Sequence, residues 1–165
     1  MRLSGDRRLL DAITVCSVAA ANLSNPIQKQ VLAGFLCVAA TTTIEDFVRN
    51  LYTEFASRNS PPFEAFVVAQ FDKFNARLRL AQIKEDFTGK IGGNYYSKFN
   101  RLRSRATTSG LLLYGRDPFS AYSDLIQWRN DFVHERRLPP ATLEDVLKSI
   151  LLSEIVLDCL RRSLR

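Results

Sequence analysis

The sequence predicts an all-α fold, a bundle of about five to six helices, and three observations lead to this prediction. Apolar residues recur at intervals of three and four along most of the chain, as they do on the buried face of a helix. Strand patterns are poor, because alternating runs are short and no Asn-Gly or Asp-Gly turn joins them. The 165 residues, 46% of them hydrophobic, suit a single core. We therefore expect residues 1–165 to form one domain.

The first two expected helices lie on either side of a short turn. They cover about Asp6 to Leu23 and about Ile27 to Arg58. Pro26 can occupy an early position of the second helix, where the backbone needs no N–H donor. Thr41 to Thr43 lower the local helix propensity and could bend this helix. Its apolar positions at helical spacing are Val31, Phe35, Val38, Ile44, Phe47, Val48, Leu51 and Phe55.

The clearest break in the chain is Asn59-Ser60-Pro61-Pro62, because consecutive prolines end a helix. A third helix then resumes with an aromatic stripe whose 3–4 spacing favours core packing over base stacking. The stripe consists of Phe63, Phe66, Val67, Phe71 and Phe74. A further helix is expected through Leu78 to Phe87, and Gly89, Gly92 and Gly93 end it.

Asn94 to Arg116 is the least regular and most basic segment. Its cations include Lys98, Arg101, Arg103 and Arg105, and Tyr95, Tyr96, Phe99 and Tyr114 lie between or beside them. Basic side chains beside aromatic ones suit contacts with phosphates and bases, so these four cations are candidate RNA-binding residues. A solvated loop with arginines extended along its surface explains the pattern equally well.

Two helices are expected in the remainder of the chain. One covers about Phe119 to His134, with Asp117 as its cap and Pro118 in its first turn. After Leu138-Pro139-Pro140, Thr142 caps a last helix that reaches about Arg162. Acidic residues at its start and arginines at its end complement the helix dipole.

The composition argues against several classes of protein. The three cysteines, Cys16, Cys37 and Cys159, are scattered in apolar stretches and read as reduced, buried thiols, which favours a cytoplasmic location. With one histidine and no CxxC pair, neither a metal site nor a cofactor is expected. Asp11 interrupts the one stretch that resembles a secretory leader. No uninterrupted apolar run reaches the roughly 18 residues of a membrane span, so no membrane partner is expected.

Arg129 is the most informative residue of the helix that ends near His134. At about 100° per residue, it lies in the middle of an apolar arc formed by Tyr122, Leu125, Ile126, Trp128, Phe132 and Val133. A guanidinium on such a face must meet a partner, a cavity or a second subunit, because an isolated buried charge is costly. Asn130 and His134 lie on one flank of the arc, whereas Arg129 and His134 are about 140° apart. Only the length of the arginine side chain, or a frayed helix end, would let those two meet.

Arg129-Asn130-Asp131-Phe132-Val133-His134 resembles the R-x4-6-H motif of the HEPN superfamily, here with the only histidine of the chain. Ile44 to Leu51 is similar to the helix of small HEPN proteins that carries a glutamate, and Pro139 to Thr142 is similar to their turn into the final helix. The resemblance is closest to the RiboL-PSP-HEPN type and spans about Val31 to the C-terminus. Residues 1–26, with the N-terminal helix, are not covered by it.

The resemblance implies a metal-independent endoribonuclease that acts as the toxin of a toxin-antitoxin pair or as an antiviral, abortive-infection effector. It implies that Arg129 and His134 are catalytic, that Asn130 supports them, and that Glu45 is a weaker candidate for orienting Arg129. It also implies a homodimer with the motif at the interface, an RNA substrate, and restraint by an antitoxin or a sensor protein. The formal charge of +6 is compatible with a nucleic-acid partner.

Three other interpretations remain open. The chain could be a non-catalytic HEPN module that binds RNA or nucleotide and mediates assembly. A basic helical DNA-binding protein is disfavoured, because a recognition helix free of core aromatics is expected there. Finally, Arg129 could pair with Glu45 or Asp131 for structural reasons, while His134 merely ends a helix.

Overall fold

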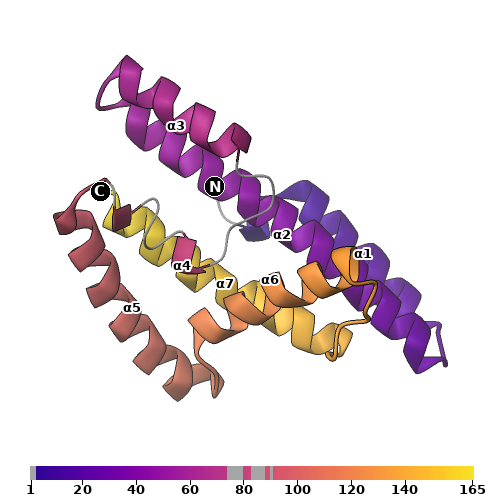
Figure 1. Cartoon of the computed structure of the whole chain (residues 1–165). Coiled ribbons are helices and arrows are strands. Elements are labelled where there is room, and N and C mark those ends of the chain that lie inside the picture. The colour runs from indigo at the N-terminus through magenta and orange to yellow at the C-terminus, as the bar shows by residue number, and fades with distance from the viewer. Residues whose placement is uncertain (1–2, 74–79, 83–87, 90) are drawn as a thin grey trace.

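We describe the protein from a computed structural model. The structure describes residues 3–73, 80–82, 88–89 and 91–165. In these ranges the chain is almost entirely helical and has no strand, which confirms the predicted all-α fold. Figure 1 shows α1 and α3 lying along the long helix α2, with α5, α6 and α7 on its other side.

A helical hairpin forms the N-terminal part of the fold. The helices α1 (Arg7–Ala21) and α2 (Pro26–Ser57) begin and end within two residues of the predicted positions. Asp6 caps α1 by accepting a hydrogen bond from the Leu9 N–H at 3.1 Å. Asn25 does the same for α2 through the Ile27 N–H at 2.8 Å. A short 3-10 turn, η1 (Leu3–Gly5), precedes α1.

The helix α2 is the centre of the core, because α1, α3, α6 and α7 all pack against it. Thr41, Thr42 and Thr43 do not break it, since each of the three hydroxyls donates to a carbonyl one turn earlier, as from Thr41 Oγ1 to the Cys37 oxygen at 2.8 Å. Its largest fully buried side chains are Leu36, Ile44 and Tyr52.

By length and composition alone, α2 could cross a membrane. More than half of its most apolar stretch is nevertheless buried against other helices, and core helices of soluble proteins meet the same criterion. That the chain has no membrane partner therefore stays a prediction.

The helix α3 (Pro61–Lys73) begins at the two prolines and lies along the C-terminal half of α2 (Figure 1). Phe63 meets Phe55 of α2 with ring centroids 6.3 Å apart, and Val67 is buried, so core packing is confirmed at these two positions. At Phe66 the prediction of core packing is wrong. This side chain is 57% exposed, because α2 is the only described element that covers α3. The Phe71 side chain, Phe74, and most of the helix expected over 78–87 lie outside the described residues, except for α4 (Leu80–Gln82).

The segment interpreted as least regular is one continuous helix, α5 (Gly93–Tyr114). The loop interpretation is therefore wrong. Only Phe99, Leu102 and Gly110 of the helix are buried. They form a narrow buried face, so the helical spacing of apolar residues is hard to recognise among the many polar ones. Gly110 permits close packing on the start of α6, because a Cβ there would lie 2.3 Å from a ring carbon of Pro118.

The two C-terminal helices, α6 (Pro118–His134) and α7 (Leu143–Ser163), match the expected bounds and caps. Asp117 accepts from the Phe119 N–H at 3.1 Å. Thr142 and Asp145 form a reciprocal capping box at the start of α7. The helices α5 and α6 both pack on α7, which closes the core on the side opposite α1 and α3.

Candidate active site

One aromatic side chain of α6 holds its C-terminal end against α2. Phe132 lies directly over Gly34, where an added Cβ would meet ring atoms at 2.5 and 2.8 Å, closer than carbon atoms approach one another. The Phe132 ring also makes an edge-to-face contact with Phe35, with centroids 5.4 Å apart. Gly34 thus lets α6 approach α2, and this contact fixes the turn that carries the predicted catalytic residues.

Three of the predicted side chains meet on that turn. Arg129 Nη1 lies 3.2 Å from His134 Nε2 and 3.1 Å from Asn130 Oδ1. Positions 129 and 134 point in different directions from the helix, and the long arginine side chain bridges the space between them. Arg129 and Asn130 are half-buried, whereas His134, the last residue of α6, is exposed.

The chain turns sharply immediately after His134. Arg136 has a left-handed φ of 55°, and the Arg137 N–H donates to the Asp131 carbonyl at 3.0 Å. The Asp131 carboxylate accepts from Gln127 at 2.6 Å and does not pair with Arg129. The imidazole therefore stands at a free helix end with its neighbouring carboxylate engaged elsewhere.

The contact between Arg129 and His134 assigns a donor and an acceptor. A guanidinium only donates hydrogen bonds, so His134 Nε2 is the acceptor. When an anionic oxygen replaces Nε2 as the acceptor for Arg129, the ring nitrogen is free to take a proton from a hydroxyl. A base and a cation thus lie side by side, a pairing that suits chemistry at a phosphodiester.

Glu45 on α2 is close enough to Arg129 to interact through its charge but not to form an ion pair. Burial raises the pKa of Glu45, the positive charges of Arg129 and Arg49 act to lower it, and the negative charge of Asp46 raises it. Among the residues that the structure describes, no carboxylate lies within 4.0 Å of the Arg129 guanidinium. Glu45 is placed to act as a nearby counter-charge.

The meeting point of Arg129 and His134 lies on an open surface. Val133, expected in the apolar arc, is 43% exposed, so burial of that arc is wrong at this position, although its neighbour Phe132 contacts α2. Phe35 of α2, which contacts Phe132 of the same turn, is 57% exposed. Apolar side chains therefore flank the polar ones at the surface.

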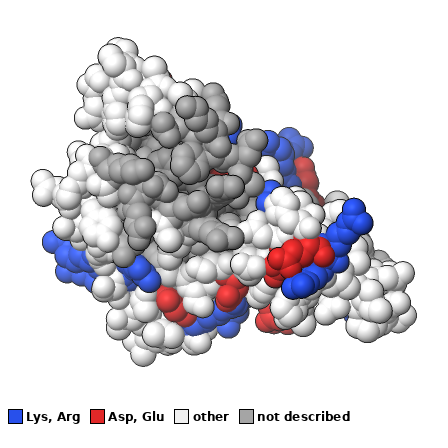
Figure 2. All heavy atoms as spheres, viewed as in Figure 1, with Lys and Arg blue, Asp and Glu red and all other residues white. Residues whose placement is uncertain are grey.

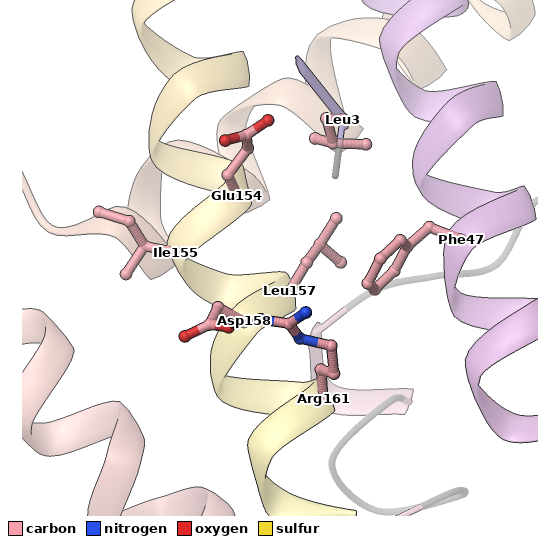
Figure 3. A pocket seen from close by; sticks show the side chains of 7 residues that line it. All are labelled: Leu3, Phe47, Glu154, Ile155, Leu157, Asp158 and Arg161. Atoms are coloured by element: carbon pink, nitrogen blue, oxygen red, sulfur yellow. Dashed lines mark hydrogen bonds and ion pairs between the residues drawn. The ribbon is translucent and has the colours of Figure 1, made fainter. Parts of the chain in front are cut away.

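Two pockets in the described part of the chain lie elsewhere. Figure 3 shows one, about 270 Å³, in which Phe47 of α2 and Leu157 of α7 point toward each other below Leu3. The second, about 290 Å³, adjoins it along α2 and includes Arg58 and Arg165. Neither contains Arg129 or His134, so they do not enclose the predicted chemistry.

The four predicted RNA-binding cations of α5 do not act as one group. Lys98, Arg101 and Arg105 share one face of the helix, and Arg101 and Arg105 are exposed. Arg103 points to another side, where its guanidinium lies over the Phe119 ring at 5.4 Å. Figure 2 shows basic atoms over α5 at one edge of the molecule, apart from those near the end of α6.

Sequence reasoning missed one residue that positions the site. Arg116 donates to the Ser149 hydroxyl at 3.1 Å and to Asp124 at 2.8 Å, and its guanidinium lies 5.8 Å from the Trp128 ring centroid. It therefore joins α6 to α7 next to the residue that precedes Arg129. The pattern offered no signal, because Arg116 reads as one more cation of a basic segment.

In the described part of the chain, no group of three His, Cys, Asp or Glu side chains could hold a metal ion. All three cysteines are buried and free, and burial raises the pKa of Cys37 to about 12. These thiols are therefore poor nucleophiles.

A family model described as RiboL-PSP-HEPN matches residues 7–165. The match includes α1, for which sequence motifs gave no resemblance. Searches of curated proteins and of solved structures found no significant match.

Proposed function

The chain belongs to the RiboL-PSP-HEPN family, and on this premise we propose that it is a metal-independent endoribonuclease with Arg129 and His134 as its catalytic residues. HEPN domains are associated with RNA cleavage or RNA binding, which is the coarser expectation for this chain. The observation that carries the proposal is the 3.2 Å contact between Arg129 Nη1 and His134 Nε2 on an exposed helix end.

In the proposed reaction, the RNA supplies its own nucleophile. Arg129 exchanges its hydrogen bond to His134 Nε2 for one to the phosphate, and Nε2 then takes the proton of a ribose 2′-hydroxyl, whose oxygen attacks the adjacent phosphorus. Arg129 donates to the non-bridging oxygens, where negative charge builds up in the transition state. The bond from phosphorus to the 5′-oxygen breaks, and that oxygen takes up a proton. The products are a 2′,3′-cyclic phosphate and a 5′-hydroxyl.

The protonation of the leaving oxygen supports the proposal of a homodimer. The chain has one histidine, so a separate imidazole acid must come from His134 of a second copy. The exposed apolar side chains of Phe35 and Val133 flank the site and suit burial against such a copy. Two sites facing each other would also enclose an RNA strand between them.

A nuclease of this kind needs restraint in the cell. We propose that the protein acts in the cytoplasm as the toxin of a toxin-antitoxin pair or as an abortive-infection effector, with an antitoxin or a sensor as its partner. Expression of the wild type should then arrest growth, and His134→Ala should relieve the arrest.

The central experiment measures cleavage of a labelled RNA in the presence of EDTA. Removing a general base typically lowers a rate by about 10²–10⁴-fold, so His134→Ala and Arg129→Ala should each lose most activity. Ser120→Ala, an exposed change near the other end of the same helix, is the matched control and should keep it. Cleavage by His134→Ala at the wild-type rate would refute the assignment.

A second variant tests whether cleavage requires the proposed dimer. Val133→Asp should produce a monomer by light scattering and should lose cleavage, because a charge would be buried at the interface. A fully active monomer would refute the shared site. RNA binding without cleavage by any dimer would instead favour the non-catalytic HEPN module that binds RNA or nucleotide.

A further inference from the structure

The basic face of α5 is separate from the candidate active site and has no described counter-charge. Lys98, Arg101 and Arg105 follow one another at intervals of three and four, so they form one stripe on the helix. Among the described residues, no carboxylate pairs with any of the three. By contrast, Arg58, Arg116 and Arg161 each bond to a neighbouring acid. We call Lys98, Arg101 and Arg105 the α5 stripe.

Phe99 and Tyr95, two aromatic residues near the α5 stripe, pack against the core. Phe99 is buried, and the Tyr95 ring packs edge-to-face on Phe55 with centroids 5.2 Å apart. They are therefore not available to stack on bases. What the stripe offers a ligand is positive charge, which suits phosphate groups and carries no base preference.

The lengths of α2 and α6 give an estimate of the distance between the α5 stripe and the active site. Along α2, Phe35 contacts Phe132 near the site and Phe55 contacts Tyr95 near the start of the stripe. Those 20 residues span about 30 Å at 1.5 Å each. Along α6, Pro118 packs on Gly110 of α5, and His134 lies 16 residues further on, or about 24 Å. These two lengths end at Tyr95 and Gly110, on either side of the α5 stripe, and both exceed the length of a dinucleotide.

We propose that the α5 stripe is a second RNA contact, which makes the enzyme select RNAs long enough to span from His134 to α5. This inference rests on the proposed ribonuclease function. At about 3.4 Å per stacked nucleotide, a span of about 30 Å corresponds to roughly nine nucleotides. Shorter RNAs bind through the active site alone, whereas longer ones gain three phosphate contacts.

The test compares two single-stranded RNAs, one of five and one of thirty nucleotides. The triple variant Lys98→Gln, Arg101→Gln and Arg105→Gln should lower kcat/KM for the long RNA about tenfold, mainly through KM. It should leave the short RNA unaffected. A second triple variant, Arg7→Gln, Lys29→Gln and Lys148→Gln, removes the same charge from exposed positions off α5 and should affect neither RNA.

A binding measurement keeps this test separate from catalysis. In the His134→Ala background, the α5 triple variant should reduce the salt dependence of long-RNA binding by a slope of roughly 2, since each single-strand phosphate contact contributes about 0.7. Arg103→Gln, which removes the contact with Phe119, should lower the melting temperature without a length effect.

The outcomes distinguish the two proposals. If the wild type cleaves neither RNA, the nuclease assignment fails, while the salt dependence still decides whether α5 binds RNA. If cleavage is normal and the α5 triple variant behaves like the charge-matched variant on both RNAs, the inference about α5 is overturned.

Discussion

Replacing Gly34 by alanine tests whether Phe132 fixes the end of α6. Inside a helix this change normally stabilises a protein by about 1 kcal/mol, because alanine is the better helix former. Here the new methyl group would lie 2.5 Å from two carbons of the Phe132 ring, so the ring must move. Overpacking of this kind costs about 1–3 kcal/mol. The net effect should lie between neutral and a loss of about 2 kcal/mol.

The double variant with Phe132→Ala isolates the contact. Without the ring, Gly34→Ala should show only its helix-propensity effect and raise the free energy of unfolding by about 1 kcal/mol. The coupling energy between the two positions should therefore be about 1–3 kcal/mol. Urea denaturation followed by circular dichroism measures all four proteins, at one fixed concentration because a dimer would link stability to mass action.

The result that refutes this reasoning is easy to recognise. If Gly34→Ala stabilises the protein equally in the presence and absence of the Phe132 ring, the two helices have no tight contact there. Slower RNA cleavage by Gly34→Ala with an unchanged helix content would in turn connect the contact to the placement of His134.

Two further predictions concern helix ends near the site. The backbone N–H and the hydroxyl of Thr142 donate to Asp145 and hold its pKa below its ordinary value of 3.8. The stabilisation from this bond is therefore complete above roughly pH 4 and is lost as the pH falls through the folded-state pKa of Asp145. Asp145→Asn should make the urea midpoint less sensitive to acid. If the midpoint of this variant depends on pH as it does in the wild type, the prediction is wrong. Arg136→Gly should raise the free energy of unfolding by about 1 kcal/mol, because glycine accepts the left-handed φ without strain. Arg137→Gly, at a position without that conformation, is the control and should not stabilise the protein in thermal melts.

Local signals in the sequence predicted helix positions well where capping chemistry is explicit. Asp117 with Pro118, and Thr142 with the acidic turn after it, mark helix starts by the hydrogen bonds that their side chains make in the structure. The helix α5 has no such cap, since Gly92 precedes it, and its buried stripe is narrow. Its pattern therefore predicted an irregular basic segment.

Burial was harder to predict than helicity. The angle of a side chain on its helix follows from the sequence, but its burial depends on how far the neighbouring helix extends. Val133 and Phe66 occupy apolar positions that no described element covers. In the site, too, helix position alone did not determine the contacts. Arg129 and His134 point in different directions from the helix, and they meet only because the arginine side chain is long enough to reach the imidazole.

The order of the helices bears on when the protein can become active during its synthesis. The turn that carries His134 is held by Gly34, about a hundred positions earlier, and by Arg116 through Ser149 on the last helix, α7. Because chains emerge from the ribosome from the N-terminus, the hairpin of α1 and α2 can form long before this support exists. A nascent or prematurely terminated chain that lacks α7 would carry the motif without the framework that orients it, so the proposed activity would begin only after α7 is made.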